Sequence, residues 1–268
     1  MTSRQPRRPA KVRTLFLSDI HLGYRRARVR ELADFLASVE AERIVLVGDI
    51  IDALSLGQSF FWAADHTNVV RALLAKRRAG ARLIFIPGNH DASLAMFAEV
   101  LNGQVEVHRE WVHRTGRGQR LLVIHGDQFD GLVTCAPWMT RLGDALYYLI
   151  VALSHGVNNV RRALGRPYWP LVERIKLGIG ASVRYIRRFE QVAASHARAA
   201  GYDGIVCGHI HRANLCEIDG VVYCNTGDWV ESCSALIETV DGELQLLRWP
   251  EGLSPARRTA TTLIADAA

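Results

Sequence analysis

Short apolar runs alternate with longer stretches of mixed polarity in the first part of this 268-residue chain. Three of the runs have the length and composition of buried β-strands: Val12–Leu17, Ile44–Val47 and Arg82–Ile86. Between them lie Arg28–Glu40, which repeats its apolar residues at helical spacing, and Thr67–Ala79, which is closed by a glycine. Strands that alternate with helices predict an α/β sheet.

The pattern becomes richer in strands after Leu121. The expected strands here are Leu121–Ile124, Gly204–Cys207, Val221–Asn225, Ala235–Thr239 and Leu244–Arg248. Taken with the first part of the chain, they predict a mixed α/β (α+β) fold with more than one group of strands.

Residues 132–200 differ from the segments on either side. Aromatic and aliphatic side chains come first, and a basic stretch follows in which only Glu173 and Glu190 are acidic. The basic residues of that stretch are Arg161, Arg162, Arg166, Arg174, Lys176, Arg184, Arg187, Arg188 and Arg198. We expect a helical insertion, or cap, over residues 132–200 that splits a core made of residues 13–131 and 201–248. Residues 1–12 are expected to form a loose basic arm, and 249–268 a C-terminal tail.

Composition and charge narrow the class of protein only slightly. The chain is 49% hydrophobic and 22% charged, which excludes wholesale disorder, and its net charge of +6 suits anionic partners. Its 5 cysteines form no C-x-x-C pair, so neither a disulfide framework nor a thiolate zinc site is indicated. The apolar run Ala145–Leu153 is too short to span a bilayer, and no secretory signal follows the basic N-terminus. We therefore expect a cytoplasmic protein that is soluble or peripheral on a membrane.

Polar residues gather in loops that directly follow apolar strands. The loop sequences are Asp19-Ile-His21, Gly48-Asp49-Ile-Ile-Asp52, Gly88-Asn89-His90-Asp91, His125-Gly126-Asp127 and Gly208-His209-Ile-His211. One such motif is weak evidence, because an isolated histidine is more often a hydrogen-bonded core residue and a Gly-Asp pair is often a simple turn. In an open α/β sheet, however, the loops beyond the carboxyl ends of the strands converge on one crevice. The series as a whole therefore predicts a functional site.

The residue types in these loops are typical of a metal site. Carboxylates, imidazoles and an Asn carbonyl suit borderline or hard divalent ions such as Mn, Fe, Zn or Mg. The D-x-H and H-x-H spacings put both side chains on the same side of an extended segment, so that both can reach one ion. Glycines before Asp49, Asn89 and His209 permit sharp turns close to that ion.

In this order, the motifs resemble those of the calcineurin-like metallophosphoesterase superfamily over residues 13–131 and 201–248. The resemblance implies a four-layer β-sandwich flanked by helices, two divalent metal ions at one end, and hydrolysis of a phosphate ester or anhydride. It implies that Asp49 bridges the two ions and that His90 acts beside the phosphate as an electrophilic or general-acid group. The implied ligands of one ion are Asp19, His21, Asp49 and His211, and those of the other are Asp49, Asn89, His125 and His209.

Three further carboxylates lie next to these residues in the sequence. Asp52, Asp91 and Asp127 either orient imidazoles from outside the ligand set or cap their own loops, and the sequence favours neither role. Asp228 is a weaker candidate of the same kind.

Within the superfamily, the chain resembles the UDP-2,3-diacylglucosamine diphosphatase branch of lipid A synthesis. The resemblance rests on Leu17–Gly23, on the insertion after Asp127, and on Tyr223–Cys233. It implies cleavage of the substrate's pyrophosphate to UMP and 2,3-diacylglucosamine 1-phosphate (lipid X), with manganese as the usual metal and a cap that receives the acyl chains. The best-known members of the branch carry Arg at the position of His90, where histidine is the residue of the wider superfamily.

Two other functions fit parts of the pattern. A nuclease or nucleotide phosphodiesterase on the same scaffold would use the basic charge for a nucleic-acid backbone, but the large apolar content of the insertion argues against it. A non-catalytic scaffold should have lost ligands, whereas every ligand position here holds a competent side chain. We therefore expect a nucleotide-sugar lipid as substrate, peripheral contact of the cap with the cytoplasmic face of an inner membrane, and no obligate protein partner.

Overall fold

The computed structural model describes residues 9–53, 61–93, 103–133, 153–154, 156–161, 163–166, 169 and 180–250. The strands of the first half are β1 (Ala10–Leu17), β2 (Val39–Val47), β3 (Arg82–Ile86), β4 (Glu106–Val107), β5 (Trp111–Arg114) and β6 (Arg120–Val123). Those of the second half are β7 (Gly204–Cys207), β8 (Asn214–Ile218), β9 (Val221–Asn225), β10 (Ser234–Glu238) and β11 (Leu244–Arg248). The helices are α1 (Val29–Ser38), α3 (Ala64–Arg78), α4 (Asp130–Val133) and α7 (Gly180–Ala199), and a 3-10 turn spans Asp127–Phe129.

The strands form two mixed sheets. The first has the order β11-β10-β1-β2-β3-β4, in which β1 to β4 run parallel and β10 and β11 are antiparallel. The second has the order β5-β6-β7-β9-β8, with β6, β7 and β9 parallel and an antiparallel strand at each edge. This arrangement confirms the predicted mixed α/β class.

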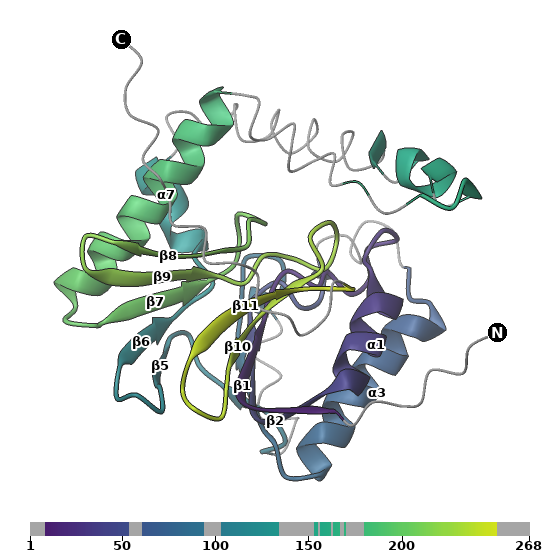
Figure 1. Ribbon diagram of the computed structural model, residues 1–268, viewed down its shortest axis with the longest axis horizontal. Helices are drawn as coiled ribbons and strands as arrows, with labels where there is room; N and C mark the ends of the chain where they lie inside the picture. Colours follow the sequence, from purple (N-terminus) through teal and green to yellow (C-terminus); the bar gives the residue numbers. More distant parts are fainter. Residues whose placement is uncertain are drawn as a thin grey trace.

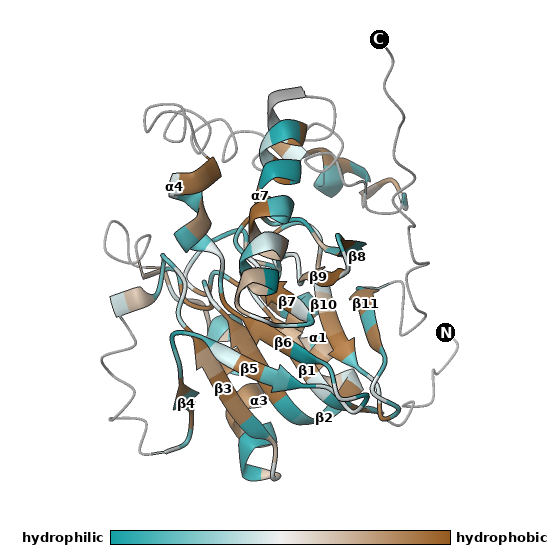
Figure 2. Ribbon diagram, turned by 90° about the vertical axis from the view of Figure 1, so that its left-hand side faces the viewer, coloured by the Kyte–Doolittle hydropathy of each residue, from teal (hydrophilic) through white to brown (hydrophobic). Residues whose placement is uncertain are grey.

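Three hydrophobic clusters hold four layers together. Phe16, Val45 and Ile84 of the first sheet meet Leu121 and Val206 of the second in the cluster between the sheets. The outer face of the first sheet packs under α1 and α3, and the outer face of the second packs under α7. Figure 1 shows the two sheets side by side, with α1 and α3 on one side and α7 on the other. The central strands are mostly brown, hence hydrophobic, in Figure 2.

Burial on both faces explains the continuous apolar runs of the sequence. Successive side chains of a strand point to opposite faces, so Phe16 packs between the sheets while Leu15 and Leu17 pack under the helices. A strand that is covered on both faces must be apolar at nearly every position. The edge strands β5 and β8 were not among the predicted strands, because they are only partly buried and lack a continuous apolar run.

Several element boundaries differ from those predicted, and two of the differences are related. The helix expected to reach Glu40 ends at Ser38, and β2 begins directly at Val39. The first strand begins at Ala10, so residues 10–12 are strand and not part of a loose arm. Both differences have one cause: parallel pairing between the two strands runs from Ala10 opposite Val39 to Leu17 opposite Leu46. Residues 1–8 lie outside the described part.

The expected cap and tail are only partly described. Positions 134–152 and 170–179 of the cap lie outside the described residues, as does 251–268 of the tail. The helix α7, expected within the cap, forms a layer of the sandwich, because Phe189, Ala193 and Ala197 are buried against the second sheet. Trp249, expected in the tail, packs its ring 5.8 Å from that of Phe35. No helix among the described residues is both long and apolar enough to cross a membrane.

Candidate metal centre

The predicted loops meet at the carboxyl ends of the parallel strands of both sheets. Backbone hydrogen bonds tie them together: Asp19 N donates to Gly48 O at 3.0 Å and His21 N donates to Asp49 O at 2.9 Å. On the second sheet, Gly208 N donates to His125 O at 3.0 Å. The two sheets join where His209 N donates to a carboxylate oxygen of Asp19 at 3.0 Å. Motifs far apart in the sequence therefore form one site.

Residues of this site adopt an unusual backbone conformation. Among the described residues, the non-glycine positions with positive φ include Asp19, His21, Asp49, His209 and His211, at 50°, 51°, 53°, 68° and 51°. Left-handed backbone is costly for residues other than glycine, and such strain concentrates at functional sites. The left-handed conformation directs these side chains toward a common centre.

One group of possible ligands joins Asp19, His21 and His211. His211 Nε2 lies 3.3 Å from Asp19 Oδ1 and 3.4 Å from His21 Nε2. All three side chains come from loops that follow β1 and β7. Their oxygen and nitrogen donors match a divalent cation of the borderline or hard class.

A second group joins Asp49, His125 and His209. His125 Nε2 lies 3.3 Å from Asp49 Oδ2, and the rings of His125 and His209 meet edge to face with centroids 5.2 Å apart. His125 Nδ1 lies 2.9 Å from Val47 O, so it donates to that carbonyl and Nε2 is left to accept or to bind an ion. The ring orientation of His125 is thus fixed by the backbone of β2.

Asp49 also belongs to a third group, with His21 and His90. Its Oδ1 accepts a hydrogen bond from the His90 backbone N at 2.8 Å, and its Oδ2 lies 3.9 Å from His90 Nε2. Asp49 is therefore the carboxylate common to the second and third groups, and His21 links the third group to the first. The distribution of ligand atoms is that of two adjoining sites and not of one.

Two of the possible ligand atoms are free to bind a cation. In the part of the chain that the structure describes, neither Asp19 Oδ1 nor His125 Nε2 has a hydrogen-bond partner, although both atoms are buried. A buried polar atom without a partner costs free energy, and a metal ion would remove that cost.

The negative charges of the site also favour the binding of cations. Burial raises the pKa of Asp49, but the imidazoles of His125, His21 and His90 outweigh it and hold the pKa of that carboxyl well below its usual range. Burial lowers the pKa of His125, but the carboxylates of Asp49 and Asp19 outweigh burial and raise that pKa to about 10. Clustered carboxylates thus draw positive charge into the site, in the form of protons when no metal is bound.

Glycines allow the close approach of these loops. A Cβ on Gly208 would overlap the carboxylate of Asp19, and one on Gly48 would overlap the ring of His125. Gly48 also has a φ of +80°, which other residues rarely adopt.

The supporting carboxylates play different parts. Asp52 contacts two imidazoles, with Oδ1 3.0 Å from His90 Nδ1 and Oδ2 3.6 Å from His21 Nδ1. Asp91 accepts backbone N–H groups instead, from Gly88 at 2.7 Å and from Ile50 at 2.7 Å, and so holds the loop that carries Asp49. Asp52 thus has the geometry of an imidazole-orienting group, and Asp91 that of a loop cap.

The remaining predicted residues are Asn89, Asp127 and Asp228, and they belong to none of the groups of possible ligands described above. Asn89 is exposed in the turn after β3, next to His90, and its part in binding an ion stays a prediction. Asp127 begins the 3-10 turn after His125. Asp228, in the loop before β10, accepts the backbone N–H of Val230 at 2.8 Å.

Sequence reasoning missed Asp130, whose Oδ1 lies 2.9 Å from His209 Nε2. Tyr185 of α7 donates its hydroxyl to the same oxygen at 3.1 Å. The His125-Gly126-Asp127 motif indicates Asp127, and nothing in its spacing indicates Asp130, three residues later. Only the packing of α4 against α7 brings Asp130 to the site.

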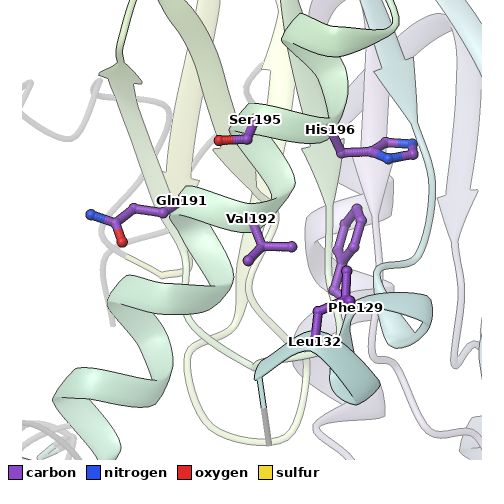
Figure 3. A pocket seen from close by; sticks show the side chains of 6 residues that line it. All are labelled: Phe129, Leu132, Gln191, Val192, Ser195 and His196. Carbon is purple, nitrogen blue, oxygen red and sulfur yellow. The ribbon is translucent and has the colours of Figure 1, made fainter.

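An open groove of about 390 Å³ lies beside Asp130, between α4 and α7. Its lining residues are Phe129, Leu132, Gln191, Val192, Ser195 and His196. Figure 3 shows Phe129 and Leu132 on the same side of α7 as Val192 and His196, while Gln191 and Ser195 extend away from them. Leu132 is 60% exposed, so the groove presents apolar surface to solvent.

Comparison with known proteins identifies similar sequences. A family model described as calcineurin-like phosphoesterase matches residues 12–213. The UDP-2,3-diacylglucosamine hydrolase of Neisseria gonorrhoeae is 21% identical over 88% of this chain and 97% of its own length. The protein of the same name from Proteus mirabilis is 28% identical, over 42% of this chain and about half (48%) of its own length. Among solved structures, an archaeal phosphodiesterase overlaps 88% of this chain and 98% of its own with 12% identity and a TM-score of 0.45, too loosely to bear on function.

Proposed function

This chain belongs to the calcineurin-like phosphoesterase family and is a metal-dependent hydrolase, and from that premise we propose that it cleaves the pyrophosphate of a lipid-linked nucleotide sugar. The proposed substrate is UDP-2,3-diacylglucosamine, and the products are UMP and 2,3-diacylglucosamine 1-phosphate. The observation that carries the proposal is the sharing of Asp49 between adjoining groups of ligand atoms, which is the arrangement that a pair of cations requires.

The proposed ligands are those of the two adjoining groups. One cation, for which we propose Mn²⁺, takes the group of Asp19, His21 and His211, and the other takes the group of Asp49, His125 and His209. We further propose that Asp49 also binds the first cation and that Asn89 completes the ligands of the second. When bound, such a pair acidifies a water molecule and neutralises the charge of phosphoryl oxygens.

His90 has the geometry of a group that acts on the substrate. Its Nδ1 faces the carboxylate of Asp52 at 3.0 Å, so Nδ1 donates and Nε2 points away from that partner. Burial lowers the pKa of His90, but its hydrogen bond to the Asp52 carboxylate and the charge of Asp49 raise that pKa above its usual value. A histidine that holds its proton in this way can stabilise a charged phosphoryl oxygen or protonate a leaving oxygen.

Exposed apolar side chains in the described part of the expected cap support a lipid substrate. Leu153, Val157, Val160 and Leu164 are 59%, 37%, 61% and 70% exposed. Their spacing of three and four residues puts them on one face of a helix. Such a face costs free energy in water and suits acyl chains, as does the groove around Leu132.

Basic residues on α7 support contact with an anionic membrane surface. Arg184, Arg187, Arg188 and Arg198 are all exposed. Each basic residue near an anionic surface contributes about 1 kcal/mol of attraction. We therefore extend the proposal to peripheral binding at a membrane, where a diacylated substrate resides.

The test is hydrolysis of UDP-2,3-diacylglucosamine with added Mn²⁺, with a UDP-sugar that lacks acyl chains and bis-p-nitrophenyl phosphate beside it. We expect manganese-dependent release of UMP from the acylated substrate at a far higher kcat/KM than from the other two. Cleavage of bis-p-nitrophenyl phosphate alone would agree with a hydrolase but would contradict the proposed substrate. Rapid, salt-sensitive cleavage of nucleic acid would favour the phosphodiesterase alternative.

A matched pair of variants tests the role of the apolar face. Val160→Ser should raise the KM for the acylated substrate about tenfold, because the burial of one aliphatic side chain is lost. Val240, which is 60% exposed but lies in the turn after β10, is the control, and Val240→Ser should leave KM unchanged. An equal KM in both variants would contradict acyl-chain contact at Val160.

A further inference from the structure

Asp130 joins the candidate metal centre to two helices that carry none of its predicted ligands. Its Oδ1 accepts hydrogen bonds from His209 Nε2 at 2.9 Å and from the Tyr185 hydroxyl at 3.1 Å. Asp130 is the first residue of α4, and Tyr185 lies on α7. The three side chains form a hydrogen-bonded series from α7 to the loop after β7.

The direction of the His209 bond follows from the chemistry of its partner. An ionised carboxylate only accepts hydrogen bonds, so His209 Nε2 carries the proton and donates a hydrogen bond to Asp130. The remaining ring nitrogen, Nδ1, then keeps its lone pair. Metal-bound histidines commonly donate their other ring N–H to a carboxylate, which fixes the tautomer and the ring orientation.

We propose that Asp130 is a positioning residue, which turns the Nδ1 of His209 toward the cation shared with Asp49 and His125, and that Tyr185 holds Asp130 in place from α7. This inference rests on the proposed function, because it assumes the same pair of cations. It adds a residue that acts through His209 and makes the affinity for one cation depend on the packing of α7.

His209 depends on these helices more than its neighbour in the same group does. The ring of His125 is fixed by the carbonyl of Val47, within β2. The ring of His209 is fixed by Asp130 and lies against the ring of Phe189 of α7, with centroids 6.1 Å apart and planes tilted by 33°. Loss of the Asp130 carboxylate would therefore free one ligand of the second group and none of the first.

The experiment is a titration of the full-length, metal-free chain with Mn²⁺, in which free Mn²⁺ is followed by electron paramagnetic resonance. The wild-type chain should bind two ions. Asp130→Ala should weaken one of them by about 10- to 100-fold and leave the other unchanged. Asp130→Asn should bind both with only a few-fold loss, because its amide oxygen still accepts the Nε2 proton of His209. Tyr185→Phe should also cost a few-fold at the same ion.

A neighbouring variant and a stability measurement separate positioning from a structural role. Gln128 lies in the same turn with its side chain exposed, and Gln128→Ala should bind both ions as the wild type does. The melting temperature of the metal-free Asp130→Ala chain should match that of the wild type within about 2 °C.

Equal affinity of the wild type and Asp130→Ala for both ions would overturn the inference. So would a loss of both ions together with a drop in the melting temperature of the metal-free chain, because that result indicates a structural role. A wild-type chain that bound no cation would overturn the proposed function itself, and this inference with it.

Discussion

Asp49 meets several structural requirements of the candidate site at once. It is nearly buried, it adopts a left-handed backbone, and it belongs to two of the three ligand groups. Its Oδ1 also accepts a hydrogen bond from the backbone of His90. A carboxylate in this position can neutralise two cations at once, which a neutral side chain of the same shape cannot.

Asp49→Asn should therefore lower turnover by about 10³-fold or more and weaken the loading of both metal sites. The physical reason is the loss of one negative charge between two cations. The measurements are manganese-dependent hydrolysis of bis-p-nitrophenyl phosphate and metal content after dialysis. Turnover near the wild-type rate would contradict a shared ligand at this position.

His90 differs from the other histidines because its proposed role is exerted on the substrate. His90→Ala should keep the wild-type metal content and slow hydrolysis by about 10²-fold, as expected for the loss of a proton donor. Metal content and kcat are measured on the same sample. His108 is the control, because it is a histidine with 41% of its side chain exposed, and His108→Ala should keep the full rate. A His90→Ala enzyme with the full rate would exclude a role in the chemical step.

At the scale of elements, a buried polar cluster links the two sheets away from the candidate site. Glu238 of β10 accepts hydrogen bonds from Thr14 of β1 at 2.9 Å, from His113 of β5 at 2.9 Å and from Gly116 N at 2.6 Å. Arg43 of β2 approaches it at 3.6 Å. Donors surround both carboxylate oxygens, so the cluster fixes how the edge of one sheet meets the other.

Glu238→Gln should destabilise the protein by about 2 kcal/mol at neutral pH, because the amide NH₂ then faces groups that also donate. Burial raises the pKa of Glu238, but its hydrogen bonds with His113, Gly116 and Thr14 lower it from 4.5 to about 2. A carboxyl whose pKa is lower in the folded state contributes stability above its unfolded pKa and loses it as the pH falls toward the folded pKa.

The difference in unfolding free energy between the wild type and Glu238→Gln should therefore be constant above about pH 5 and shrink as the pH falls toward 2. Urea unfolding at a series of pH values measures this difference. A difference that stayed constant down to pH 2 would show that the ionised carboxylate contributes nothing.

At the scale of the whole molecule, the candidate site sits where both sheets end, so metal binding should stabilise the entire sandwich. Cations that bind only the folded state add about 3 kcal/mol when their concentration is 100 times the dissociation constant. Removal of metal by a chelator should then lower the melting temperature by roughly 5–10 °C. Restoring Mn²⁺ should reverse the change, and Asp49→Asn should respond much less. A melting temperature indifferent to the chelator would argue against cations that bridge the sheets.

The sequence by itself determined the class of fold and which motif residues could lie together, and the structure brings Asp19, His21, Asp49, His125, His209 and His211 close to one another. Strands buried on both faces must be continuously apolar, so their positions can be predicted from hydrophobicity alone. Pairs of possible ligands are also close in the sequence, since Asp19 and His21, like His209 and His211, are two residues apart. The order of the motifs can likewise be read from the sequence. The helix α1 was predicted to within two residues of its end, and the error arose because Val39 has a partner in Ala10.

Tertiary structure decided which polar atoms outside the motifs meet. Asp130 and His209 are 79 residues apart, Tyr185 and Asp130 are 55 apart, and His113 and Glu238 are 125 apart. Nothing in the local sequence distinguishes Asp130 from Asp127, or Glu238 from any other acid at the end of a strand. Their roles arise only when α7 packs on the second sheet and the two sheets pack on each other, because hydrogen bonds act over about 3 Å and only folding brings distant residues within that range.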